Sequence, residues 1–262
     1  MANGAHTSVF STAMTAWRDA LAARERMPSL FLIAIIAVAS LNLAYFGLVI
    51  VGVIFGTGLL ASLLGLIYVG VQALLLTPLA IAVHRFLVLG ETNDNYRIDT
   101  QDPRFVKFLT FLVGLFVISF IPQLLRSHFI SPTGTSAFGG LISLIVSIIV
   151  AIIAVRVLIV FPAVAVDAPG AEWRNAMADT KGHSWRVFFI LLCLILPAAV
   201  VVSIVLFICF MIPLIGWLIS VAIQAAFSVM IVAATAAAAS RLYIDYANQL
   251  GRPTGVAPQA AI

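Results

Sequence analysis

Three arginines stand where they could bind a phosphorylated ligand. Arg85, Arg156 and Arg241 each lie at one end of a long apolar run. A guanidinium group makes paired hydrogen bonds to phosphate, so three of them at neighbouring helix ends would hold an anion or a lipid headgroup. Arg156 is the strongest candidate for such an anion site, because more apolar sequence follows it. The alternative is that each is a topological anchor, with Arg241 paired to Asp245 four residues on.

A second set of polar residues is uncharged and lies near the middle of the apolar runs. Asn42, Gln72 and Gln224 are amides that either line a path for a solute or form hydrogen bonds between helices. We predict the hydrogen bonds, which helices in a membrane commonly use. A coupled carrier usually has an ionisable group at this depth, and here only neutral amides are found. A small-solute transporter or channel is therefore the second functional hypothesis.

Catalysis, metal binding and cofactor binding are not predicted. There is no His-Glu-x-x-His motif, and Ser143 lacks the Gly-x-Ser-x-Gly context of a serine nucleophile. The apolar runs contain no pair of carboxylates, and the four histidines are scattered. The sequence therefore predicts a protein with no enzymatic activity, no metal and no cofactor, and an intramembrane enzyme is the last alternative.

The elements that must position these residues are apolar helices. Of the 262 residues, 63% are apolar and 9% are charged, which excludes a soluble globule, a nucleic-acid binder and a disulfide-stabilised secreted domain. We predict an all-α polytopic membrane protein with six transmembrane helices in three hairpins within residues 28–248. The predicted helices are 29–55, 59–86, 105–125, 138–161, 185–211 and 214–243.

The charges predict the orientation of these helices. All ten acidic residues and 13 of the 14 basic residues fall in segments on one side, and Arg126 is the exception. Because positive charge is retained in the cytoplasm, we expect both termini to be cytoplasmic. The loop Ser127–Ala137 then lies on the opposite side.

Residues 1–27 are predicted to contain a separate amphipathic helix. Polar residues occupy one of its faces, and apolar residues occupy the other: Val9, Phe10, Ala13, Met14, Trp17, Ala20 and Leu21. We expect this helix to lie along the membrane surface, and the alternative is a solvated helix packed on the bundle. A second interfacial segment is predicted at 168–183, and a flexible cytoplasmic tail at 249–262.

A short motif recurs along the chain. Trp17–Ala22 matches Trp173–Ala178 at an offset of 156 residues with four identities, and the same offset carries Arg85 onto Arg241. We interpret this as a parallel internal repeat, in which an interfacial helix and a hairpin occur at 8–86 and again at 170–243. Helices three and four would form a third, degenerate hairpin.

Three segments resemble a known family. They are Ala178–Phe188, the sequence His84-Arg85-Phe86 followed by Gly90-Glu91, and Phe161-Pro162 through Asp167. Together they resemble uncharacterised bacterial six-helix membrane proteins, which are similar to the membrane domain attached to some glycerophosphodiester phosphodiesterases. The catalytic barrel of those enzymes needs about 250 further residues, so hydrolysis is not implied.

This resemblance implies a multi-pass protein of the bacterial inner membrane. Combined with the arginines, it predicts a non-enzymatic protein that binds lipid or an amphiphilic anion at the cytoplasmic leaflet, or that has an assembly role there. The expected partners are membrane lipids, and no nucleic acid is expected. The sequence does not identify protein partners.

Overall fold

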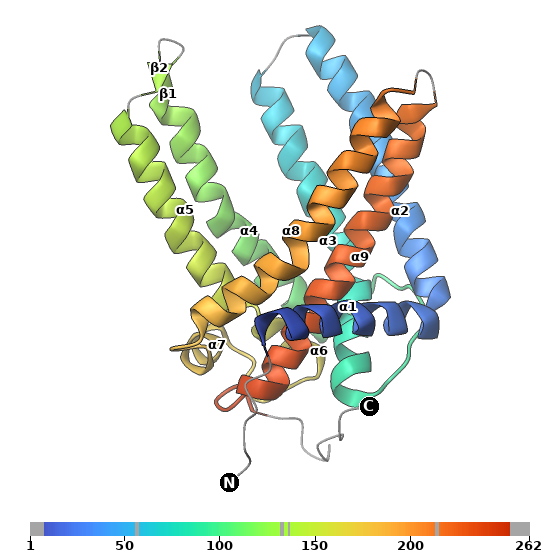
Figure 1. Cartoon of the computed structure of the whole chain (residues 1–262), viewed down its shortest axis with the longest axis vertical. Coiled ribbons are helices and arrows are strands. Elements are labelled where there is room, and N and C mark those ends of the chain that lie inside the picture. Colours follow the sequence, from blue (N-terminus) through green and yellow to red (C-terminus); the bar gives the residue numbers. More distant parts are fainter. Residues whose placement is uncertain (1–7, 56–57, 132–133, 136, 213–214, 252–262) are drawn as a thin grey trace.

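The computed structural model describes residues 8–55, 58–131, 134–135, 137–212 and 215–251. This part of the chain is helical apart from two short antiparallel strands, β1 (Ile130–Ser131) and β2 (Gly134–Thr135). The helices follow in the order shown in Figure 1: α1 (Val9–Arg26), α2 (Pro28–Phe55), α3 (Gly58–Leu89), α4 (Pro103–Phe129), α5 (Ala137–Val157), α6 (Val160–Ala165), α7 (Trp173–Asp179), α8 (Ser184–Phe210) and α9 (Gly216–Tyr246).

Within the described residues, six spans are long and apolar enough to cross a membrane. They belong to α2, α3, α4, α5 with α6, α8 and α9, which confirms the predicted class of all-helical membrane protein. The fourth predicted helix, 138–161, is interrupted, since α5 ends at Val157 and α6 begins at Val160. Pro162 explains the break, because a proline cannot donate the next helical hydrogen bond but is tolerated in the first turn of a new helix.

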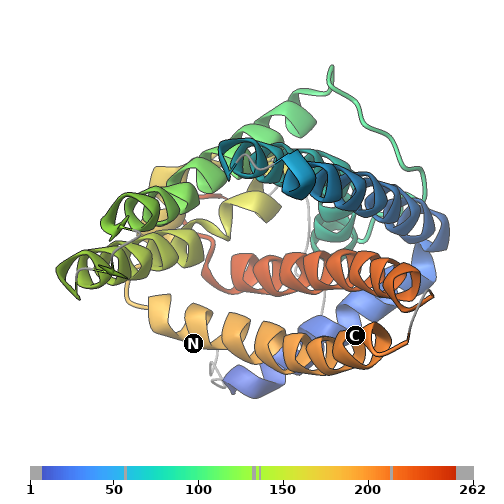
Figure 2. The same ribbon diagram turned by 90° about the horizontal axis from the view of Figure 1, so that it is seen from above.

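Helix α9 is central to the packing. It contacts α1, α2, α3 and α8, and Figure 2 shows it lying between α8 and the pair α2–α3. Its second half is rich in alanine, and Ala233, Ala234 and Ala236–Ala239 are buried. Small side chains let neighbouring backbones approach closely, which is how helices associate where lipid is as apolar as the protein.

Helices α4 and α5 lean away from the other spanning helices. They pack against each other, and in Figure 1 they diverge from α3 and α8 toward the end of the bundle opposite α1. They contact the rest of the protein through α3, α6, α7 and α8. We call the end of the bundle that carries α1, α6 and α7 the α1 end.

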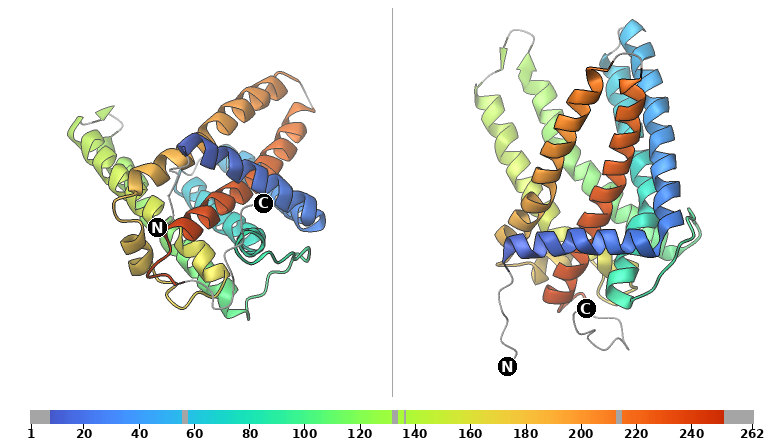
Figure 3. Two further views of the ribbon diagram at one scale, coloured as in Figure 1. Left: turned by 60° about the horizontal axis from the view of Figure 1, so that its bottom comes forward. Right: turned by 45° about the vertical axis from the view of Figure 1, so that its right-hand side comes forward.

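Helix α1 lies across the spanning helices, as the right-hand view of Figure 3 shows. Ser8 begins it, because its hydroxyl accepts the Ser11 N–H. The predicted apolar face is split in two. Its alanines are buried and α1 packs against α8 and α9, whereas Phe10, Met14 and Leu21 are 65%, 44% and 45% exposed. We call these three residues the exposed stripe.

The predicted tail begins with an ordered segment. The Asp179 carboxylate accepts the main-chain N–H groups of Asn248, Gln249 and Leu250 at 2.9–3.0 Å, and the Leu250 side chain is fully buried. Residues 249–251 are therefore held against the fold by a partner about 70 positions earlier, contrary to the prediction. Residues 252–262 lie outside the described chain.

Candidate functional site at the α1 end

The described charged side chains gather on α1, at the helix ends near it and in the connections between those ends. Arg126, the exception expected from the sequence, has a side chain outside the described part of the structure. The charges that predicted the topology therefore form a belt at the α1 end, in which Arg85, Arg104 and Arg241 are ion-paired. Each of the three predicted arginines belongs to this belt.

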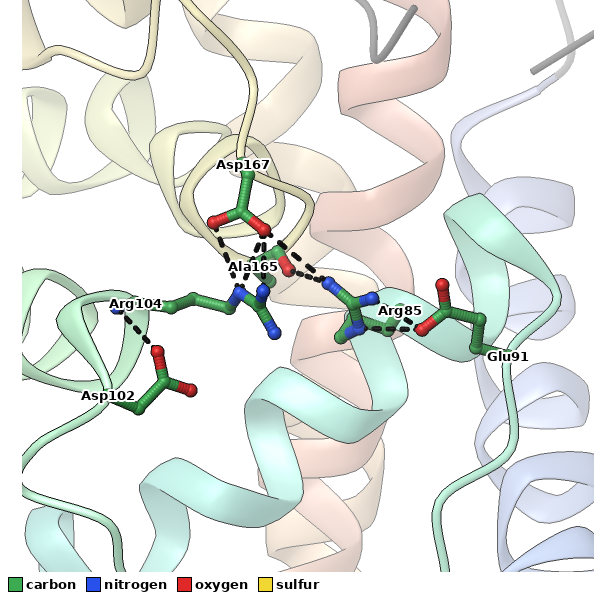
Figure 4. Close-up of polar contacts among 6 residues, drawn as sticks. All are labelled: Arg85, Glu91, Asp102, Arg104, Ala165 and Asp167. Atoms are coloured by element: carbon green, nitrogen blue, oxygen red, sulfur yellow. Dashed lines mark hydrogen bonds and ion pairs between the residues drawn. The ribbon is translucent and has the colours of Figure 1, made fainter. Parts of the chain in front are cut away.

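Arg85 lies in a cluster that joins three segments (Figure 4). Its Nε is 2.8 Å from the Glu91 carboxylate, and its Nη1 donates to the Ala165 carbonyl at 3.0 Å. Asp167 lies 3.8 Å from Arg85 and accepts from Arg104, with a closest distance of 2.6 Å. Asp167 thereby links the end of α3 to the start of α4.

The backbone at Asp167 is left-handed, with φ of 55°, and no other described non-glycine residue has a positive φ. Aspartate tolerates this conformation better than most residues, and the turn follows directly after α6. The Asp167 side chain is 57% exposed, so solvent screens its ion pairs to about 1 kcal/mol or less. Because all three nitrogens of the Arg85 guanidinium already have acceptors, we interpret the cluster as a structural link.

Arg156 bonds to a different segment. From the last turn of α5 its Nη2 donates to the Met177 carbonyl of α7. The Thr180 hydroxyl lies 2.7 Å from the Ala176 carbonyl and 3.2 Å from the Arg156 carbonyl. A cation beside the last carbonyls of a helix is favourable, because those groups have no helical partner. Its Nε is buried and has no hydrogen-bond partner among the described residues.

Arg241 is paired to α1. Its Nη2 donates to Asp19 at 2.9 Å, and its Nε binds the other oxygen of the same carboxylate. The Asp19 side chain is only 16% exposed. The predicted local partner, Asp245, is thus replaced by a residue 222 positions away. Sequence reasoning missed Asp19 because only the packing of α1 on α9 brings the two together.

The three arginines therefore bind three different segments, and Arg241 has a further property. It lines a cavity of about 160 Å³ together with Ser11, Thr12, Thr15, Ile244 and Asp245. The hydroxyls come from α1 and the other residues from α9. This cavity lies between a helix that crosses the bundle and one that spans it.

The predicted amides are placed separately. Asn42 is buried and accepts the Tyr68 hydroxyl at 2.8 Å, which joins α2 to α3 as an interhelical hydrogen bond. Gln72 on α3 is half-buried, and Gln224 on α9 is exposed. The Asn42 bond has the structural role that we predicted for these amides.

The connection 90–102 packs back on the hairpin before it. The Asp94 carboxylate accepts the Leu30 N–H at 2.9 Å at the start of α2. This hydrogen bond holds the pKa of the Asp94 carboxyl below its usual value. The Tyr96 hydroxyl donates to the Leu75 carbonyl of α3 at 2.8 Å. A segment with little hydrophobic sequence is thus ordered by hydrogen bonds.

Across the described ranges, no group of three or more His, Cys, Asp or Glu side chains is arranged to hold a metal ion. Comparison of the chain with family models, curated proteins and solved structures gives no match. The candidate site is therefore defined by its geometry alone.

Proposed function

We propose that this chain is a multi-pass protein of a bacterial inner membrane that binds a phospholipid headgroup at the α1 end and has no enzymatic activity. The observation that carries the proposal is the cavity beside Arg241, which combines a guanidinium group with three hydroxyls. The charge asymmetry of the sequence and its resemblance to bacterial six-helix membrane domains support this setting, with both termini in the cytoplasm.

Helix α1 has the features of a helix that lies in a membrane interface. It crosses the spanning helices, and its exposed stripe stands beside the exposed residues Arg18, Arg24 and Arg26. Large apolar side chains next to arginines suit the boundary between acyl chains and headgroups. The cavity that α1 forms with α9 would then lie at the depth of the headgroups.

Arg241 retains capacity for a phosphate. Two of its nitrogens bind Asp19, and among the described residues Nη1 has no hydrogen bond. A phosphate oxygen in the cavity would accept from Nη1, while Asp19 keeps the guanidinium plane oriented. The anion site predicted for three arginines is thus proposed at Arg241 alone, without Arg85 and Arg156.

The internal repeat is part of the proposal. Moved by 156 positions, α2 (28–55) falls on 184–211 and α3 (58–89) falls on 214–245, close to the bounds of α8 and α9. The His84 Nδ1 lies 2.8 Å from the Ser240 hydroxyl, and these residues are also 156 positions apart. Contact between equivalent residues is expected near an axis that relates two copies.

The segments before the hairpins repeat a packing pattern. Trp17 of α1 donates a hydrogen bond to α8, and Tyr96 donates one to α3. Trp173 of α7 packs against α4, where two of its ring carbons lie 3.1–3.2 Å from the point that a Cβ would occupy at Gly114. Each segment therefore contacts a hairpin other than the one it precedes. This cyclic order supports three related hairpins around one axis.

Native mass spectrometry of the detergent-purified protein tests lipid binding. We expect a retained phospholipid in the wild type and about tenfold weaker retention in Arg241→Gln, since a hydrogen bond to a charged group is lost. Asp19→Asn breaks the same ion pair but keeps Arg241 in the cavity, without the Asp19 carboxylate that occupies two of its nitrogens. Retention of phospholipid should therefore stay equal or increase. Arg18→Gln, which removes a charge from the exposed face of α1, is the matched control.

The pattern across these variants separates binding from folding. If Asp19→Asn and Arg241→Gln lose lipid equally, the ion pair acts only by holding α1 in place, and Arg241 is not a ligand. If the wild type retains no phospholipid, the proposed function is wrong.

A further inference from the structure

The α1 wall of the cavity accepts hydrogen bonds. Ser11 and Thr12 donate their hydroxyl protons to the Ser8 carbonyl at 2.8 and 3.2 Å, and Thr15 donates to the Ser11 carbonyl at 2.7 Å. A hydroxyl has a single proton, so while these bonds are made each of these groups presents its lone pairs to a ligand. This wall therefore suits a hydrogen-bond donor better than a phosphate.

The α9 wall adds a negative charge. Asp245 has an exposed carboxylate that interacts electrostatically with Arg186 and Arg241. The charge of Arg241 is balanced by Asp19 through two of its nitrogens. The cavity thus offers one carboxylate and three acceptor hydroxyls on its walls, with the remaining donor of Arg241 beside them.

Apolar side chains border these polar groups. Ile244 lines the cavity and is 45% exposed, and Met14 of the exposed stripe lies between Ser11 and Thr15 on α1. A ligand that places a small cation among the acceptors, a phosphate at Arg241 and acyl chains over the apolar residues would match all three features.

We infer that the cavity selects a phospholipid whose headgroup carries a primary ammonium group. This inference rests on the proposed function. An ammonium group has three N–H donors for Asp245 and the hydroxyls, whereas the quaternary ammonium of a choline headgroup has none. The Arg241 Nη1 binds the phosphate of the same lipid, so the site binds both charged groups of a zwitterionic headgroup.

Lipid competition on the full chain tests this selectivity. The delipidated protein is mixed with equal amounts of phosphatidylethanolamine and phosphatidylcholine that have identical acyl chains, and bound lipid is counted by native mass spectrometry. We expect about tenfold preference for phosphatidylethanolamine, because its ammonium group donates to the carboxylate and a choline group has no N–H to donate. Asp245→Asn should remove the preference while some lipid is still retained.

A second variant avoids any change of charge. Thr15→Val replaces a hydroxyl that bonds only to its own helix by a methyl group of similar size, so the fold should persist and the preference should fall severalfold. Thr110→Val is the matched control, because the Thr110 hydroxyl bonds in the same way to Val106 on α4, away from this cavity.

The outcomes separate this inference from the proposed function. Equal retention of the two lipids, or a preference for anionic phosphatidylglycerol, overturns the selectivity and leaves lipid binding intact. Absence of any retained lipid overturns both. Soluble phosphoethanolamine should bind at least about tenfold more weakly than the lipid, since it has no acyl chains. Equal binding of the soluble compound would show that the ligand is not a lipid.

Discussion

Trp17 and Trp173 occupy the same position in the two copies of the motif, yet their indole groups differ in bonding. The Trp17 Nε1 donates to the Leu194 carbonyl of α8 at 3.1 Å. Leu194 lies three residues before Pro197, and a proline disturbs the helical bonding of the carbonyls before it. The Trp173 Nε1 is buried without an acceptor in the described part of the chain.

This difference predicts unequal effects of one substitution. Trp17→Phe should lower the free energy of unfolding by about 1 kcal/mol more than Trp173→Phe, because both remove the same volume but only the first breaks a hydrogen bond. Thermal unfolding of the two variants in the same detergent measures the difference. Equal losses of stability would show that the Trp17 bond contributes nothing.

At this scale the sequence predicted the positions of the charged residues but not their partners. Arg85, Arg156 and Arg241 were expected at helix ends, and they lie there. Asp19 and Asp167 carried no local signal, because each meets its arginine only through the packing of distant segments. The pattern of charges indicates on which side of the membrane a segment lies, whereas the ion-pair partner of each charge depends on tertiary structure.

Among the elements, α1 shows most clearly what periodicity can and cannot predict. The polar and apolar pattern predicted a helix within residues 1–27, and α1 occupies Val9–Arg26. The pattern did not separate Ala16 and Ala20, which face the bundle, from Phe10 and Leu21, which are exposed. Lipid and protein interior are both apolar, so only side-chain size distinguishes the two faces.

The alanine face of α1 should be sensitive to size. Ala16 is fully buried, so Ala16→Leu should lower the free energy of unfolding by about 1–3 kcal/mol through overpacking. Ala22→Leu adds the same atoms at an exposed position of the same helix and should have little effect. Resistance to limited proteolysis near residue 26 and thermal unfolding measure both. A harmless Ala16→Leu would mean that α1 is not held by this face.

Over the whole molecule, the six spans were predictable because a stretch of about 20 apolar residues is a strong signal. The arrangement of those spans was not. Helix α9 became the centre of the packing through its buried alanines, and α4 with α5 leaned outward. Neither property follows from hydropathy, since the central helix α9 and the peripheral helix α4 have nearly the same mean hydropathy.

The orientation of the molecule can be tested with single cysteines after both native cysteines are replaced. We expect Thr133→Cys to react with an impermeant thiol reagent in intact cells, and Ala22→Cys and Gln259→Cys to react only after the membrane is opened. Ala22 is an exposed residue of α1. Positions 133 and 259 lie outside the described residues.

Labelling of Gln259→Cys in intact cells would contradict a model with both termini in the cytoplasm. Failure of Thr133→Cys to react in intact cells, together with reaction after opening, would place the loop on the same side as the termini and would contradict the number of spans.

The contacts of α1 also set an order in time. Trp17 meets a partner 177 positions later, and Asp19 meets one 222 positions later. At synthesis rates of about 5–20 residues per second, α1 waits about 10–40 s for these partners. Until α8 and α9 have been made, the alanine face of α1 lacks the helices against which it packs. The docking of α1 is thus a late event in biogenesis, and a nascent chain interrupted before α8 and α9 leaves that face open to chaperones and proteases.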